Sequence, residues 1–292
     1  MSTSFLENFL VQLKKRSNFV IKQLIIISCV FFTFSCAHTD PNNHSASATN
    51  VLPEYVFSPE ANLPTKVAQT LQIAASKNQK ALLVLGAQWC HDSKGLAMKF
   101  STPEMQKILS KNYQTLFIDV GYLEKGFDIV KKFNLPVYYG TPTVMVIDPN
   151  STEILNRASM QKWLSADRVK LADYIEYFDK FAESSIEQSN NESGKSNTSM
   201  QKYLNQINDF EQQQATRLKS AYTIVGPLLQ QYMESENKKA SGEFSSKWEE
   251  VRSLRYRIQD DIQVLSAQAK QNIKAGTKQP LVFPNYPAFS WE

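Results

Sequence analysis

The sequence predicts an α/β domain with a mixed sheet flanked by helices, followed by an all-α helical hairpin region. Short apolar runs alternate with amphipathic segments over residues 60–184, which is the pattern of strands connected by helices. A polar linker follows at 185–198. Over residues 199–292 the chain is mostly helical in pattern, because apolar residues recur every three or four positions as far as residue 274.

The first elements of the α/β domain follow from apolar spacing and from residues that favour helix boundaries. Residues 62–79 have the apolar spacing of a helix, and residues 81–87 are short, continuous and apolar, as in a buried strand. A helix is expected from about Cys90. A second helix should begin at Thr102 as N-cap, with Pro103 at its first helical position.

The rest of the α/β domain should complete a mixed sheet. We expect a strand at 114–120, a short helix at 124–135, a strand at 138–148 with a hairpin partner at 152–157, and a last helix capped by Ser165. Strands separated by helices predict parallel pairing, whereas the final close pair predicts an antiparallel hairpin.

The C-terminal region should form two long helices. Residues 243–274 have the clearest amphipathic pattern of the chain, and Gly226-Pro227 should kink or split the helix before them. The hairpin is either an appended structural module or a surface, over residues 199–274, that binds another protein. The aromatic tail at 280–292 should dock on a folded surface.

Composition excludes several classes of function. The chain has 292 residues, a net charge of +4 and an apolar fraction of 42%, which is enough for a packed core. Most of the positive charge lies in residues 1–35, so the remainder is nearly neutral and lacks the basic surface of a nucleic-acid-binding protein. No phosphate-binding glycine motif occurs, and the histidines do not have the spacing of a zinc site, so we expect no cofactor and no metal.

The N-terminus has the pattern of an export signal. Basic residues precede a mainly apolar run of 11 residues at 24–34, too short for a bilayer span of about 20 residues. It therefore predicts a signal peptide over 1–36, followed by a flexible tether over 37–59. Ser35-Cys36 resembles a bacterial lipoprotein cleavage site, which would put a lipid on Cys36; plain signal cleavage or an uncleaved anchor are the alternatives. We expect an exported protein, in the periplasm or anchored to the membrane of a bacterial cell envelope.

The folded part of the chain keeps a single thiol, that of Cys90, because the other two cysteines lie at or before residue 36. Such a thiol cannot form a structural disulfide within the domain, so it is either reactive or buried and vestigial. At a helix N-terminus, unpaired amides and the helix dipole stabilise a thiolate. His91 can add positive charge beside it, and the Ser93 hydroxyl can hydrogen-bond the sulfur.

Two motifs together resemble the thioredoxin superfamily over residues 60–184. Trp89-Cys90 follows a predicted buried strand, and Thr141-Pro142 precedes another predicted strand about 50 positions later. The resemblance implies a thioredoxin-like fold in which Cys90 is the nucleophile and Trp89 lies beside it. It also implies that Pro142 is a cis-proline facing the thiol, and that Thr141 offers its backbone to an extended substrate.

Two departures from that family limit the chemistry. Ser93 stands where a second, resolving cysteine is usual, and Val84 stands where the family has a buried acidic residue. A single thiolate can form a mixed disulfide, but an outside thiol must then release it. The sequence therefore predicts a monothiol oxidoreductase or isomerase acting on protein disulfides or low-molecular-weight thiols. The alternative is a non-catalytic thioredoxin-like scaffold that binds another envelope protein. Tyr138 and Tyr139 either line the groove beside Pro142 or are ordinary strand-edge aromatics.

Overall fold

The computed structural model of the chain describes residues 55–183 and 198–292, which belong to the unit formed by residues 51–292. The expected signal peptide, Cys36 and the tether up to residue 54 lie outside the described residues, as does the linker up to residue 197. Tyr55 and Phe57, within the expected tether, pack against Phe117, and Phe57 is buried. The packed chain therefore begins before residue 60.

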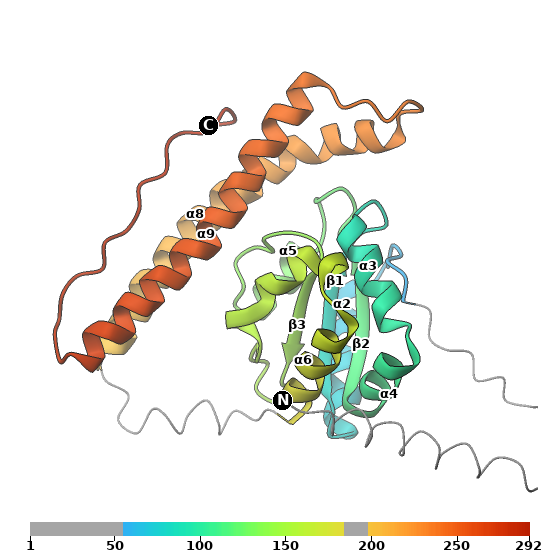
Figure 1. Cartoon of the computed structure of the whole chain (residues 1–292), viewed down its shortest axis with the longest axis horizontal. Helices are drawn as coiled ribbons and strands as arrows, with labels where there is room; N and C mark the ends of the chain where they lie inside the picture. The colour runs from blue at the N-terminus through green and yellow to red at the C-terminus, as the bar shows by residue number, and fades with distance from the viewer. Residues whose placement is uncertain (1–54, 184–197) are drawn as a thin grey trace, which may run out of the picture. The chain divides into compact units, whose positions relative to one another are not determined.

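The sheet has three strands in the order β2-β1-β3 (Figure 1). β1 (Lys80–Gly86) lies in the centre and is buried nearly throughout, as its continuous apolar sequence predicts. β2 (Tyr113–Asp119) pairs with it in parallel, and β3 (Thr143–Ile147) pairs with it antiparallel. The predicted mixed sheet is therefore confirmed.

The direction of β3 differs from the prediction that strands separated by helices are parallel. In the register, Gly86 lies opposite Asp119 and Leu85 lies opposite Thr143, so β2 ends and β3 begins at the same edge of the sheet. α5 (Phe127–Lys132) spans about 9 Å, whereas β2 spans about 23 Å. α5 therefore does not return the chain to the far edge, and the chain enters β3 from the edge where Cys90 lies.

The predicted hairpin partner at 152–157 is wrong as a strand, since the structure has only an isolated bridge there. The buried side chain of Asn156 accepts a hydrogen bond from the Val146 amide at 2.9 Å and donates one to the Val144 carbonyl, also at 2.9 Å. The Asn156 side chain thus binds two backbone groups at the edge of β3, while Leu155 donates its backbone amide to Val146 and Glu153 accepts the Asp148 amide. The spacing of apolar residues cannot reveal this mixture of side-chain and backbone pairing.

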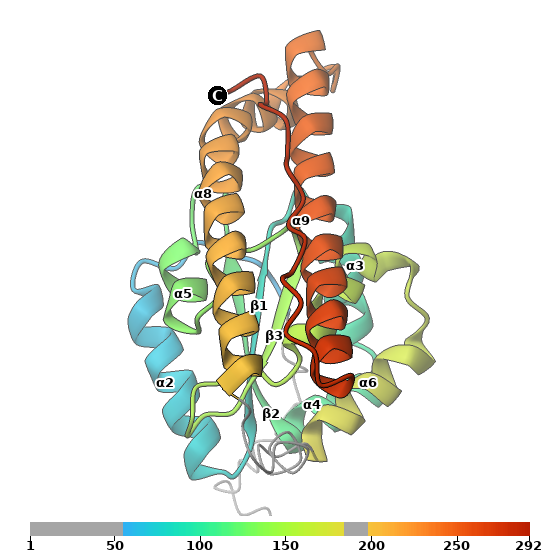
Figure 2. The ribbon, with the colours of Figure 1, turned by 90° about the vertical axis from the view of Figure 1, so that its left-hand side faces the viewer.

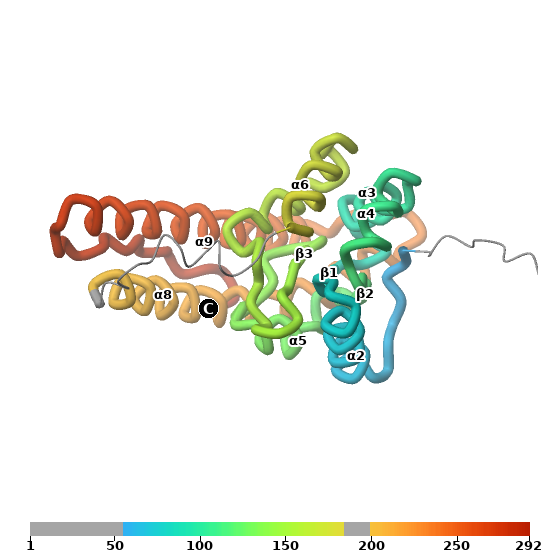
Figure 3. Tube along the Cα trace, turned by 90° about the horizontal axis from the view of Figure 1, so that it is seen from below, coloured from blue at the N-terminus to red at the C-terminus, as the bar shows by residue number. Residues whose placement is uncertain are grey.

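Helices cover both faces of the sheet (Figures 2 and 3). Leu83 and Leu85 point into a core shared with α2 and α5, whereas Leu82 and Val84 point into a second core shared with α3, α4 and α6. The bounds are α2 Leu63–Ser76, α3 His91–Phe100, α4 Pro103–Asn112 and α6 Leu171–Glu183. This is an α/β fold with a mixed sheet flanked by helices, as predicted.

The last helix of the α/β part begins later than predicted. Arg157–Arg168 form η2, a 3₁₀ segment in which Ser165 has a non-helical backbone, so Ser165 does not cap α6. Trp163 of η2 is fully buried and lies 4.6 Å from the ring of Tyr174 in α6. The Tyr174 hydroxyl donates to the Ala166 carbonyl at 2.8 Å. These contacts hold η2 against α6, and a contact of this kind is not visible in local sequence.

The C-terminal region is a pair of long antiparallel helices, α8 (Thr198–Glu234) and α9 (Gly242–Lys274), as predicted (Figures 1 and 2). Pro227 lies inside α8, which bends before its end but remains one helix. Ser241 caps α9 by accepting the Phe244 amide at 3.0 Å. No helix within the described ranges is long and apolar enough to cross a bilayer.

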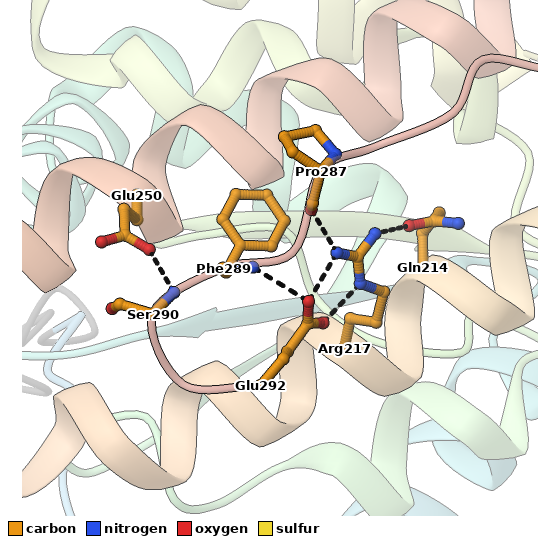
Figure 4. A network of polar contacts seen from close by, with 7 residues as sticks. All are labelled: Gln214, Arg217, Glu250, Pro287, Phe289, Ser290 and Glu292. Atoms are coloured by element: carbon orange, nitrogen blue, oxygen red, sulfur yellow. Dashed lines mark hydrogen bonds and ion pairs between the residues drawn. The ribbon is translucent and has the colours of Figure 1, made fainter.

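The C-terminal tail was predicted to dock on a folded surface, and the structure shows that this surface is the hairpin (Figure 4). Arg217 of α8 donates to the Glu292 carboxylate and to the Pro287 carbonyl, each at 2.7 Å. Glu250 of α9 accepts the Ser290 amide at 2.8 Å. The tail thus contacts both helices.

Candidate functional site

The candidate site lies at the sheet edge where β1 ends and β3 begins. Cys90 is the N-cap residue of α3 and is mostly buried, with 9% of its surface exposed. Its thiol donates a hydrogen bond to the Thr141 carbonyl at 3.2 Å, although the two residues are 51 positions apart. The Thr141-Pro142 peptide bond is cis. The structure therefore brings Cys90, Thr141 and Pro142 together.

Ser93 and His91 flank the thiol without acting as its hydrogen-bond partners. The Ser93 side chain is fully buried, and its hydroxyl accepts the Ala87 amide at 3.4 Å. Ser93 therefore supports the turn between β1 and α3. His91 is largely exposed, and its Nε2 lies 3.5 Å from the Asp167 carboxylate.

Trp89 is held between the α/β part and the helical hairpin. Its indole N–H donates to the Gly121 carbonyl at 2.7 Å, and its ring stacks on Tyr122 with ring centroids 6.5 Å apart. Asp119, in turn, accepts the Gly121 amide at 3.2 Å. On the other side, Trp248 of α9 contacts Trp89 edge to face, with centroids 6.4 Å apart. α9 therefore contributes to one wall of the site.

α9 also contributes to the opposite wall, beside the cis-proline. A Cβ on Gly140 would lie only 3.2 Å from Nη1 of Arg255, so the guanidinium is next to Gly140. Arg255 also lies over the ring of Trp248, 5.4 Å from its centroid. Sequence reasoning missed Arg255 as a site residue. The available signal was its spacing, because it follows Trp248 by seven positions and so shares its face of the helix.

Tyr138 and Tyr139 do not lie on a strand edge, and Tyr139 is among the residues that line a cavity of about 530 Å³. They precede β3 and bind α8 through hydrogen bonds. The Tyr222 hydroxyl donates to the Tyr138 carbonyl at 3.1 Å, and the Tyr139 hydroxyl donates to the buried Glu211 carboxylate at 2.6 Å. Burial and the Glu211 charge hold the pKa of Tyr139 well above its ordinary value of 10.0, so Tyr139 remains a donor at neutral pH.

The described residues do not gather three or more His, Cys, Asp or Glu side chains in a group that could hold a metal ion. A cavity of about 530 Å³ lies between η2 and the hairpin, with Leu164, Ile207 and Ile262 among its lining residues. Cys90 is not among them, so this cavity is separate from the thiol.

No protein-family model and no curated protein matches the chain. A solved structure described as a disulphide isomerase from Xylella fastidiosa Temecula1 is similar, with 21% sequence identity and a TM-score of 0.41. The similarity covers 44% of this chain and 96% of that chain.

Proposed function

We propose that the chain is a thioredoxin-like protein of the bacterial cell envelope whose Cys90 reacts with disulfides as a single nucleophilic thiol. The observation that carries this proposal is the 3.2 Å contact between Cys90 Sγ and the Thr141 carbonyl beside Pro142. The contact holds the sulfur at the N-terminus of α3, next to the cis peptide bond between Thr141 and Pro142. The signal peptide and the lipid on Cys36 belong to the same proposal and would place the protein in the envelope.

The chemistry is thiol–disulfide exchange through a mixed disulfide. The Cys90 thiolate attacks one sulfur of a disulfide, the old S–S bond breaks, and the other half leaves as a thiolate that takes a proton from solvent. A hydroxyl cannot take the place of a resolving thiol, so Ser93 cannot release the product. An outside thiol must do so. A low-molecular-weight thiol would give reductase-like turnover, and a second thiol of the substrate would give isomerase-like turnover.

A non-catalytic scaffold is the second candidate function. The burial of Cys90 and the contact of Trp248 with Trp89 favour it, because a thiol that stays covered cannot meet a disulfide. In that case the hairpin would serve to bind another envelope protein.

Mass spectrometry separates the two candidates. The native mature protein and a Cys90→Ser variant are incubated with hydroxyethyl disulfide, and the adduct is located by peptide mapping. The enzyme proposal expects one adduct on Cys90, its absence from Cys90→Ser, and its removal by added thiol. An adduct on Cys90 that forms only after denaturation would favour the scaffold.

A further inference from the structure

The two walls beside Cys90 are both completed by α9. Trp248 contacts Trp89, the residue before the thiol, and Arg255 lies next to Gly140, the residue before Thr141. Because Arg255 also lies over Trp248, these two side chains connect the walls across the site.

The hairpin also occupies backbone and side-chain groups that precede the cis-proline. The Tyr138 carbonyl accepts a hydrogen bond from Tyr222 of α8, and the Tyr139 hydroxyl donates one to Glu211 of α8. The Thr141 carbonyl is occupied by Cys90 itself, whose thiol donates to it. An extended peptide would need access to this stretch of backbone to lie across the thiol. The arrangement therefore disfavours extended polypeptide and leaves small disulfides as the better fit.

The guanidinium of Arg255 places a positive charge between Gly140 and Trp248. Its Nε–H is buried and has no hydrogen-bond partner, and the ion pairs of the described residues do not include it. Burial raises the pKa of its neighbour Tyr222 to about 12, although the Arg255 charge and a hydrogen bond between the two side chains lower it in part. Tyr222 is therefore neutral at pH 7 and does not balance the charge of the guanidinium. A guanidinium with a free donor favours a carboxylate, which accepts charge-assisted hydrogen bonds.

We propose that Arg255 binds a carboxylate of the substrate, so that Cys90 acts on low-molecular-weight disulfides that carry a negative charge. This inference rests on the proposed thiol chemistry of Cys90 and adds the class of substrate. Cys90 attacks the disulfide sulfur, one half of the substrate remains bound through the new S–S bond, and the other half leaves as a carboxylate-bearing thiolate. A second low-molecular-weight thiol then attacks the mixed disulfide and frees Cys90.

Three disulfides that differ mainly in charge test the proposal: dithiodipropionate is anionic, hydroxyethyl disulfide is neutral and cystamine is cationic. The rate of adduct formation on Cys90 should follow that order. Arg255→Gln should lower the ratio of the anionic to the neutral rate by about ten- to a hundredfold, as expected from the loss of one hydrogen bond to a charged group. Arg255→Lys should retain part of the preference, because it keeps the charge but not the planar fork.

Lys270→Gln is the matched control. It removes the same charge from α9 about 22 Å further along the helix and should leave the ratio unchanged. The order of the three rates in the unsubstituted protein tests the proposal even if a variant fails to fold. Equal rates for the three probes, or an equal effect of Lys270→Gln and Arg255→Gln, would overturn the role of Arg255 while leaving Cys90 reactive. No reaction with any probe would overturn the thiol chemistry itself.

Discussion

At the scale of single residues, the difference between a hydroxyl and a thiol at position 93 decides how the proposed reaction ends. Ser93 follows Cys90 by three positions at the start of α3, where it is buried and accepts the Ala87 amide. Its hydroxyl supports the turn but cannot form an S–S bond. Release of a mixed disulfide would therefore depend on an outside thiol.

Ser93→Cys should allow an internal disulfide with Cys90. Helix geometry places residues three apart at roughly 5 Å between Cα atoms, within the range of roughly 4.4–6.8 Å that disulfides require. Under oxidising conditions, peptide mass spectrometry should show a bond between Cys90 and the introduced thiol. The variant should also release its mixed disulfides without added thiol.

Ser93→Ala is the control for this prediction, because it removes the same hydroxyl without supplying a thiol. It should form no such bond and should still need an outside thiol. If Ser93→Cys remains unbridged after complete oxidation, the two side chains do not face one another and the assigned geometry of the turn is wrong.

At the scale of elements, side chains decide where helices and strands begin and end. Ser241 begins α9 by binding the Phe244 amide, which would otherwise lack a partner. At the edge of β3, the Asn156 side chain binds the backbone of Val144 and Val146 beside a short bridge between Ile147 and Ile154. A serine N-cap such as Ser241 can be recognised in the sequence, whereas the Asn156 contacts depend on how two separate segments pack.

Ser241→Ala should destabilise the protein by about 1 kcal/mol, the usual cost of losing an N-cap hydrogen bond. Urea unfolding followed by circular dichroism measures the change in the free energy of unfolding. Ser253→Ala, at an exposed position inside α9, is the control and should be neutral or slightly stabilising, because alanine favours helix interiors. Equal losses from the two variants would show that the cap is unimportant.

At the scale of the whole described unit, the helical hairpin and the α/β part share a core and a buried polar contact. The Glu211 carboxylate of α8 is 7% exposed at its side chain, lies 2.7 Å from Arg157 and accepts the Tyr139 hydroxyl. Leu218 and Val225 of α8 belong to the same apolar cluster as β1. The position of the hairpin beside the thiol therefore depends on this junction.

Glu211→Ala should destabilise the protein by about 1–3 kcal/mol, because it leaves the buried Tyr139 hydroxyl without an acceptor and Arg157 without its ion pair. Chemical denaturation measures the loss. Glu236→Ala removes the same charge from the exposed turn between α8 and α9 and should change stability by less than about 0.5 kcal/mol. Losses of the same size from both variants would contradict a specific role for Glu211 at the junction.

Local sequence was enough to predict an α/β part with a mixed sheet and the helical hairpin that follows it. Apolar residues that recur about every two positions indicate a strand, and those that recur about every four indicate a helix, so both signals come from nearby residues. A helix cap such as Ser241 is equally local, because its partner is only three residues away. The Trp89-Cys90 and Thr141-Pro142 motifs also pointed to the edge of the sheet where these residues meet.

The tertiary structure alone decided the direction of β3, the binding of the edge of β3 by Asn156 and the contribution of α9 to the site. Glu211 stood in a polar gap between apolar positions of α8, and only its contact with Tyr139, 72 positions away, shows why a carboxylate is buried there. Likewise, the apolar spacing of α9 predicted only that Trp248 faces the protein. Its contact with Trp89 shows that it lies next to the residue that precedes Cys90. The physical reason is that periodicity shows which face of a helix is buried, whereas the partner of that face is set by packing between segments far apart in the chain.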